Sequence, residues 1–148
     1  MVLPMPRRLG IFTKAECGFG TMMYRILVVD DSKLARMAVA KAFNAVQPDW
    51  TRVEASSAEE ALSLAKASHF DIAFLDFNMP DRDGLHLAAD LRAASPGTVL
   101  AVLSANHQKE VVERSEAAGA TFLSKPLTEA ALGDFLVIAG NKLKAGKS

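Results

Sequence analysis

The sequence has little of what marks secreted, membrane-spanning or nucleic-acid-binding proteins. Its 148 residues include one cysteine, Cys17, so no internal disulfide can form, and we expect a reducing cytoplasm. No apolar run approaches the roughly 18 residues that a membrane span needs. Lysine and arginine together number 17 and balance 17 aspartates and glutamates, without a long run of either sign. We therefore expect neither nucleic acid nor a membrane as a partner, because both are bound through clustered basic residues.

Residues 1–22 lack the periodicity of the rest of the chain. They are interrupted by Pro4, Pro6, Gly10, Gly18 and Gly20. They also lack the apolar core and cleavage site of a secretory signal. We expect a disordered extension, or a start codon assigned too early with translation beginning at Met22 or Met23; an N-terminal arm with a function is the alternative. Residues 23–148 are long enough for one domain with its own core.

From residue 24 onward the pattern predicts five strands that alternate with five helices. The expected strands are 24–29, 51–55, 72–76, 98–103 and 121–124. The expected helices are 32–46, 57–68, 85–94, 107–118 and 129–144. In the first helix, Leu34, Ala38, Ala42 and Val46 follow one face. Strands that are apolar on both faces are typical of a parallel sheet covered by helices on both sides, so the pattern predicts an α/β fold.

Polar side chains follow several of these strands at the point where each strand ends. They are Asp30, Asp31, Asp76, Ser104 and Lys125. In an open α/β sheet, ligands bind at the carboxyl ends of the strands. Taken singly, each residue has an ordinary structural explanation, such as a helix cap for the aspartates or a surface position for the lysine. Their shared placement at one edge of the sheet favours a functional site.

This set of residues resembles the receiver domain of two-component response regulators. The matching features are the Asp30-Asp31 pair, Asp76 with Met79-Pro80-x-x-Asp83-Gly84 behind it, Ser104-Ala105, and Lys125-Pro126. The resemblance extends from about residue 24 to about residue 143. It implies a doubly wound, five-stranded parallel sheet of flavodoxin-like order 2-1-3-4-5 with five helices. In that order the acids and the serine share one pocket.

The resemblance also implies a chemistry for the site. Asp76 would accept a phosphoryl group, and Mg²⁺ would be held by Asp31, Asp76 and the backbone carbonyl of Asn78, with Asp30 acting mostly through water. Hard oxygen ligands suit Mg²⁺, and an aspartate carboxylate can serve as a nucleophile toward phosphorus. Lys125 would pair with the phosphoryl oxygens. The expected phosphodonor is a sensor histidine kinase or a histidine phosphotransfer protein.

The signal would leave the site through a switch pair. Ser104 would donate a hydrogen bond to the phosphoryl group, and the ring of Phe122 would turn inward, changing the surface of the fourth helix, fifth strand and fifth helix. Receivers commonly carry threonine at the first position, and Phe122 lacks the hydroxyl that a tyrosine would bring. The resemblance further predicts a cis bond between Lys125 and Pro126.

Two other functions are alternatives to this one. A haloacid dehalogenase-type enzyme also uses an aspartate nucleophile with Mg²⁺, but it needs a second carboxylate two residues on, where this chain has Asn78. A binding module that works without phosphorylation would not need all five polar residues. His69, His86 and His107 lack the neighbours of a metal site and are expected in solvent. Since no sequence after Ser148 is left for an output domain, we expect a CheY-like stand-alone receiver rather than an enzyme.

Overall fold

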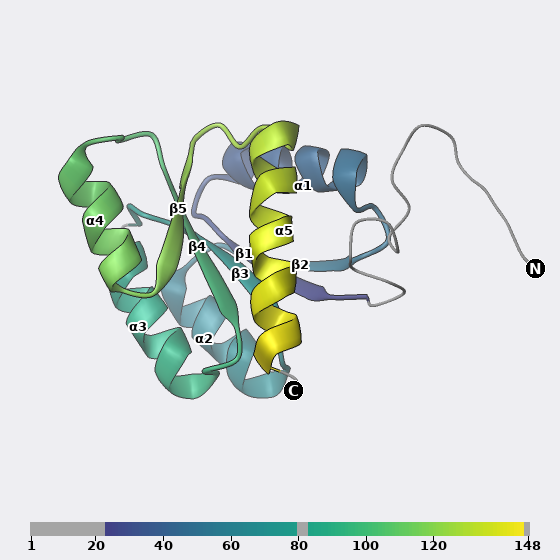
Figure 1. The fold of residues 1–148 in the computed structure, drawn as a ribbon. Helices are drawn as coiled ribbons and strands as arrows, with labels where there is room; N and C mark the ends of the chain where they lie inside the picture. Colours follow the sequence, from purple (N-terminus) through teal and green to yellow (C-terminus); the bar gives the residue numbers. More distant parts are fainter. Residues whose placement is uncertain (1–22, 80–82, 147–148) are drawn as a thin grey trace, which may run out of the picture.

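A computed structural model of the chain describes residues 23–79 and 83–146. These residues form a three-layer α/β structure (Figure 1). The strands are β1 (Arg25–Val29), β2 (Thr51–Ala55), β3 (Ile72–Asp76), β4 (Val99–Ser104) and β5 (Ala120–Ser124). The helices are α1 (Lys33–Val46), α2 (Ala58–Ala67), α3 (Gly84–Ala94), α4 (Lys109–Ala117) and α5 (Glu129–Gly146). The predicted N-terminal extension lies outside the described residues.

All strand pairs are parallel, and the sheet has the order β2-β1-β3-β4-β5, which confirms the predicted fold. Helices α1 and α5 pack against each other on one face, α2 and α3 pair on the other, and α4 packs beside the edge strand β5 (Figure 1). Every residue of β3 is buried, as expected for a central strand covered on both faces.

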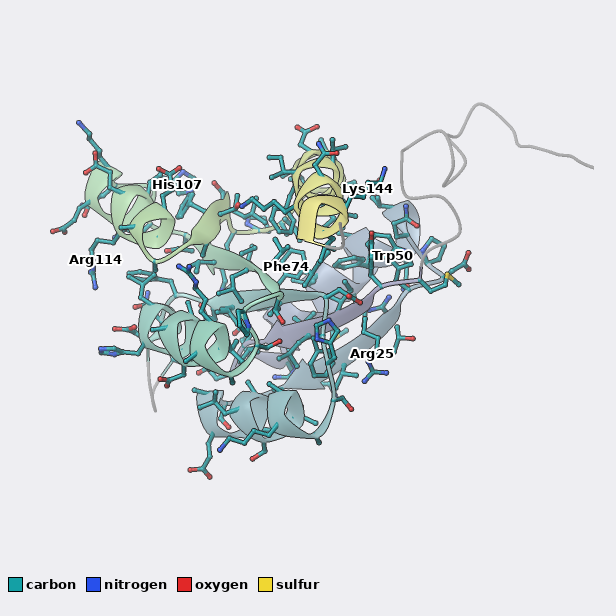
Figure 2. All side chains as sticks on the ribbon, turned by 60° about the horizontal axis from the view of Figure 1, so that its bottom comes forward. Arg25, Trp50, Phe74, His107, Arg114 and Lys144 are labelled. Atoms are coloured by element: carbon teal, nitrogen blue, oxygen red, sulfur yellow. The ribbon has the colours of Figure 1, made fainter. Side chains whose placement is uncertain are left out.

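Alternate residues of the strands supply two apolar layers. On the α1 and α5 side the layer includes a chain of ring contacts in which Phe74 meets Phe43 at 5.4 Å and Phe135 at 5.3 Å between centroids. Figure 2 shows Phe74 between the sheet and α5. On the other side, Leu27 and Leu75 pack among residues of α2 and α3. Each strand is thus fixed in register, because a shift by one residue would exchange its two faces.

Side-chain hydrogen bonds mark the starts of two helices, and a glycine marks the end of a third. Ser57 accepts a hydrogen bond from the Glu60 amide at the start of α2, and Thr128 accepts one from the Ala131 amide at the start of α5. Gly119, after α4, has a φ of 85°, the left-handed conformation expected of a helix-terminating glycine. Within the described residues, no helix combines the length and the apolar character needed to cross a bilayer.

Two details differ from the predictions. In α1 the buried residues are Val39, Ala42 and Phe43, whereas Leu34 is 77% exposed, because it lines an open apolar groove instead of packing in the core. Helix α4 begins at Lys109 rather than residue 107. The amide of Gln108 bonds to the Asn106 side chain, so residues 105–108 belong to the loop that follows β4.

Candidate functional site

The carboxyl ends of β1, β3, β4 and β5 meet at one edge of the sheet, as their parallel order requires. Just past the strand ends the backbone pairing continues for one residue. The amide of Asp30 donates to Ala55, that of Phe77 to Leu103, and that of Lys125 to Ser104. These bonds hold the polar residues of neighbouring strands at one level. The structure therefore brings together the residues that the sequence placed at this edge.

Asp30, Asp31 and Asp76 form an acidic cluster in which one carboxylate oxygen of each lies within 4.8 Å of the others. Asp30 and Asp76 are buried, with 3% and 5% of their surface exposed, and Asp31 is exposed. Burial raises the pKa of Asp76 above its usual range, and the charge of Asp30 acts in the same direction. Carboxylates at this spacing favour the binding of a cation.

The Lys125 ammonium reaches into this cluster from the loop after β5. Its Nζ lies 3.0 Å from Asp30 Oδ2 and 2.9 Å from Asp76 Oδ1. Burial works to lower the pKa of Lys125, but the hydrogen bonds to Asp76 and Asp30 outweigh it and raise the pKa. The Lys125–Pro126 peptide bond is cis, as predicted. The lysine is therefore held in its charged form between the two buried acids.

Ser104 and Asn78 flank Asp76. The Ser104 hydroxyl is buried and accepts a hydrogen bond from the Asn106 amide at 3.0 Å, so it is bound to its own loop. The amide of Asn78 donates to Asp76 Oδ1 at 3.3 Å. This last bond gives Asp76 a second donor besides Lys125, one from the backbone that follows it.

Phe122 of β5 is half-buried, and its ring makes an edge contact with the ring of His107, with 6.0 Å between centroids and 76° between planes. His107 lies beside α4 (Figure 2). His69, His86 and His107 are all exposed, as expected. His107 nevertheless contacts the predicted switch residue, which the sequence did not indicate.

Gly84 permits the close approach of α3 to the end of β3. A Cβ atom at this position would collide with the carbonyl oxygen of Asp76 and lie 3.0 Å from the Cα of Phe77. The Gly84 amide also donates to the Phe77 carbonyl at 2.9 Å. Asp83 begins the helix by accepting a hydrogen bond from the His86 amide at 2.8 Å. The glycine of the motif thus fixes the backbone that carries Asp76.

Sequence reasoning missed one residue at the site, Arg36 of α1. Its Nη1 donates to the backbone carbonyl of Asp30 at 2.7 Å, and its Nε donates to Glu54 Oε1 at 2.8 Å. An arginine one helical turn after an Asp-Asp pair carries no distinctive signal in a single sequence, since exposed helices are rich in arginine. The contact depends on the way α1 folds back over the end of β1.

An apolar groove of about 380 Å³ opens beside the acidic cluster. Its polar lining comes from Asp30 and Lys125, and its apolar lining comes from α1, the end of β4 and the loop before α5, namely Leu34, Ala35, Ala38, Val39, Leu103, Ala105, Pro126 and Leu127. Leu34 is exposed at the mouth of this groove. A protein surface that reached Asp76 from this side would meet apolar contacts.

The donor set fits a hard divalent cation. Carboxylate oxygens are the ligands that Mg²⁺ prefers, and the exposed position of Asp31 leaves room for the water molecules that this ion usually retains. Asp31 and Asp76 would hold such an ion with their side chains, and Asp30 would act mostly through a bound water.

A sequence model of the response regulator receiver domain matches residues 26–136. The chain belongs to this family. Among curated relatives, the protein-glutamate methylesterase/protein-glutamine glutaminase 1 of Methanosarcina mazei is 33% identical over 110 residues, 72% of this chain and 30% of that protein. A putative transcriptional regulator of Pseudomonas aeruginosa is 35% identical over 122 residues, 80% of this chain and 58% of that protein. The matched part of this chain thus spans only 30% and 58% of the length of these two relatives.

Solved structures show the same fold. The chemotaxis protein CheY4 of Vibrio cholerae superposes with a TM-score of 0.71 at 27% identity, covering 80% of this chain and 99% of that one. The receiver domain of AraT from Geobacillus stearothermophilus has a TM-score of 0.75 at 25% identity, covering 86% of this chain and all of that one. The chain thus carries a CheY-like receiver domain of the kind used in two-component signalling.

Proposed function

We propose that this receiver accepts a phosphoryl group on Asp76 from a sensor histidine kinase or a histidine phosphotransfer protein. The observation that carries the proposal is the burial of Asp76 within an acidic cluster, with the Lys125 ammonium 2.9 Å from its Oδ1. An ionised carboxylate in this position is a nucleophile beside a cation. Receivers are signalling domains, and the activity proposed here is confined to self-catalysed phosphotransfer and dephosphorylation.

In the proposed transfer, an oxygen of Asp76 bonds to the phosphorus while the bond between phosphorus and the donor breaks. The electron pair of that bond leaves with the donor nitrogen, and Asp76 becomes an acyl phosphate. Lys125, already bonded to Asp76, stabilises the negative charge on the phosphoryl oxygens. Asp31, Asp76 and the Asn78 carbonyl would hold Mg²⁺, with Asp30 acting mostly through water, and the bound ion would further neutralise that charge.

The signal is proposed to leave through Ser104. A hydroxyl can accept one hydrogen bond and donate another, so Ser104 can donate to a phosphoryl oxygen while it keeps its bond from the Asn106 amide. The loop then follows Ser104. Asn106 in turn accepts from the Gln108 amide at the start of α4, and the neighbouring His107 contacts Phe122. Movement of Ser104 would therefore reach both α4 and β5.

The surface formed by α4, β5 and α5 is the proposed output face. The inward turn of Phe122 would bury a fully apolar ring, worth about 1–3 kcal/mol, enough to shift a two-state equilibrium by one to two decades. The apolar groove beside Asp30 and Lys125 is lined by residues of α1, the end of β4 and the loop before α5. It is proposed to receive the phosphodonor protein, whose histidine must come within bonding distance of Asp76.

The test is phosphorylation by acetyl phosphate, followed by mass spectrometry of the intact protein. We expect the wild type to gain one phosphoryl group in Mg²⁺ and none in EDTA. Asp76→Asn should abolish labelling, and Asp31→Ala should slow it and weaken Mg²⁺ binding. Asp134→Asn, which changes an exposed acid on α5, is the matched control and should label normally. Full labelling of Asp76→Asn would overturn the proposal.

The remaining proposals concern the whole protein. We propose a single-domain response regulator, in line with CheY4, which the alignment covers almost completely. Residues 1–22 are proposed to be dispensable, so a chain that starts at Met23 should keep its melting temperature and phosphorylation rate. A loss of several degrees would instead indicate that they pack on the domain. The cytoplasmic location stays a prediction from the sequence.

A further inference from the structure

Arg36 connects three elements at the acidic edge of the sheet. It comes from α1, its Nε pairs with Glu54 of β2 at 2.8 Å, and its Nη1 donates to the carbonyl of Asp30, past the end of β1, at 2.7 Å. Its side chain is 16% exposed, against 46% for Glu54. The guanidinium is thus mostly buried and fixed at two of its nitrogens, in the forked geometry that lysine cannot reproduce.

The carbonyl that Arg36 binds controls the position of Asp31. The Asp30 carbonyl and the Asp31 amide belong to one planar peptide unit. A hydrogen bond that holds the Asp30 carbonyl therefore also fixes the orientation of the Asp31 amide. On the other side of this unit, the Ser32 amide donates to Asp30 Oδ1 at 2.9 Å. The Asp31 carboxylate itself has no hydrogen bond to any other residue in the described part of the chain. Its place in the acidic cluster therefore depends on its backbone.

We propose that Arg36 is a positioning residue for the cation site. By holding the Asp30–Asp31 peptide, it keeps the Asp31 carboxylate within reach of Asp30 and Asp76 before any cation binds. This inference rests on the proposed function, since it assumes that the cluster binds Mg²⁺. Partners that orient metal ligands without touching the metal typically change its affinity by about 10–100-fold.

The direction in which Mg²⁺ affinity changes when the Arg36 guanidinium is removed distinguishes a positioning role from a purely electrostatic one. Arg36 is a cation close to a cation site, so its charge alone opposes Mg²⁺ binding. If charge were its main influence, removal of the guanidinium would tighten Mg²⁺ binding. If it positions Asp31, removal should weaken Mg²⁺ binding despite the lost repulsion.

The experiment is isothermal titration of the full chain with Mg²⁺. Arg36→Gln should raise the dissociation constant about tenfold. Arg36→Lys should recover part of that loss, because lysine can donate to the Asp30 carbonyl but cannot also hold Glu54. The matched control is Arg52→Gln. Arg52 of β2 also bridges to α1, where its Nη1 bonds Asn44 Oδ1 at 3.1 Å, but it makes no contact with the cluster. It should leave the dissociation constant within about twofold.

Amide spectra of the metal-free protein provide a second readout. Arg36→Gln should shift the amides of Asp31 and Ser32, while Arg52→Gln should leave them in place. If Arg36→Gln does not fold, Glu54→Gln takes its place. This substitution weakens the contact between the Arg36 guanidinium and Glu54, and it should weaken Mg²⁺ binding less than Arg36→Gln would.

Three results would overturn the inference. If the wild type binds Mg²⁺ and Arg36→Gln binds it equally or more tightly, Arg36 does not position the site, while the proposed function stands. Equal weakening by Arg52→Gln would show a general effect of the α1–β2 contact. Failure of the wild type to bind Mg²⁺ would remove the cation site and the inference together.

Discussion

Replacement of Lys125 by methionine tests how the acidic cluster is stabilised in the absence of metal. The substitution keeps most of the side-chain length and removes the ammonium that bonds Asp30 at 3.0 Å and Asp76 at 2.9 Å. Both carboxylates are buried, so neither can recover full hydration when the lysine is lost. Without metal, Lys125→Met should therefore be markedly less stable than the wild type.

The magnitude follows from opposing contributions. At an effective dielectric constant of about 20, each contact is worth roughly 5–6 kcal/mol of Coulomb attraction. Most of that attraction is offset by the cost of removing the charges from water, and breaking a buried ion pair typically costs about 3–5 kcal/mol. The Lys125 side chain is 27% exposed, which favours the lower end, about 3 kcal/mol. For a domain of this size that corresponds to a fall of roughly 10 °C in melting temperature.

Urea unfolding in EDTA and in saturating Mg²⁺ measures the effect. The deficit of Lys125→Met should be largest in EDTA and smaller in Mg²⁺, because the bound cation supplies positive charge to the same carboxylates. The control is Lys109→Met. Lys109 pairs with Glu113 at 3.8 Å on the surface and is 87% exposed, so its loss should change stability by at most about 0.5 kcal/mol.

Two results would refute this reasoning. If Lys125→Met were as stable as the wild type in EDTA, the buried acids would not depend on the lysine. An equal deficit with and without Mg²⁺ would show that Lys125 stabilises the fold through its aliphatic chain rather than through Asp30 and Asp76.

Three further predictions concern neighbouring residues. Burial raises the pKa of Asp76, so the folded protein holds that proton more tightly than the unfolded chain. The free energy of unfolding in EDTA should therefore gain a falling component as pH rises through the raised pKa, and Asp76→Asn should remove that component in melting curves between about pH 4 and 7. Gly84→Ala should cost about 1–3 kcal/mol in urea, because its methyl group meets backbone, whereas Gly133→Ala, with nothing within 4 Å, should not destabilise α5. Ser104→Ala should still label at Asp76 but should lose the amide shifts that beryllofluoride induces across residues 105–135 in the wild type; unchanged shifts in the wild type itself would contradict the proposed switch.

The alternation of strands and helices and the location of the acidic edge could be predicted from the residue pattern of the sequence. Buried strands such as β3 are apolar on both faces and end abruptly at a carboxylate, so their ends are visible without a structure. The specific order, the cis Lys125–Pro126 bond and the lysine's reach into the site came from the family resemblance. Periodicity alone does not distinguish one doubly wound order from another.

The details that escaped prediction depend on tertiary contacts. Leu34 has the helical spacing of a core residue, but it lines the open groove beside the acidic cluster, and spacing does not reveal which part of a helix face the core covers. Residues 107 and 108 continue a helical pattern, yet the Asn106 side chain binds the Gln108 amide and delays the start of α4. Arg36 acts through a backbone carbonyl, which no side-chain pattern in the sequence indicates.

Under the proposed function, the charge of the acidic cluster gives the neighbouring Ser104 hydroxyl a role. Asp30, Asp31, Asp76 and Lys125 together carry −3 + 1 = −2 when ionised, and a bound Mg²⁺ would bring the sum to zero. Phosphorylation would remove the Asp76 charge of −1 and add about −1.5 to −2, so the site would again become negative. The site would also gain phosphoryl oxygens that accept hydrogen bonds, and Lys125 cannot donate to all of them while it is bonded to Asp30. Ser104 lies at the end of the neighbouring strand β4, and its hydroxyl has a proton to donate to a phosphoryl oxygen. Because Ser104 is also bonded to the β4–α4 loop, this new hydrogen bond would connect phosphorylation to that loop.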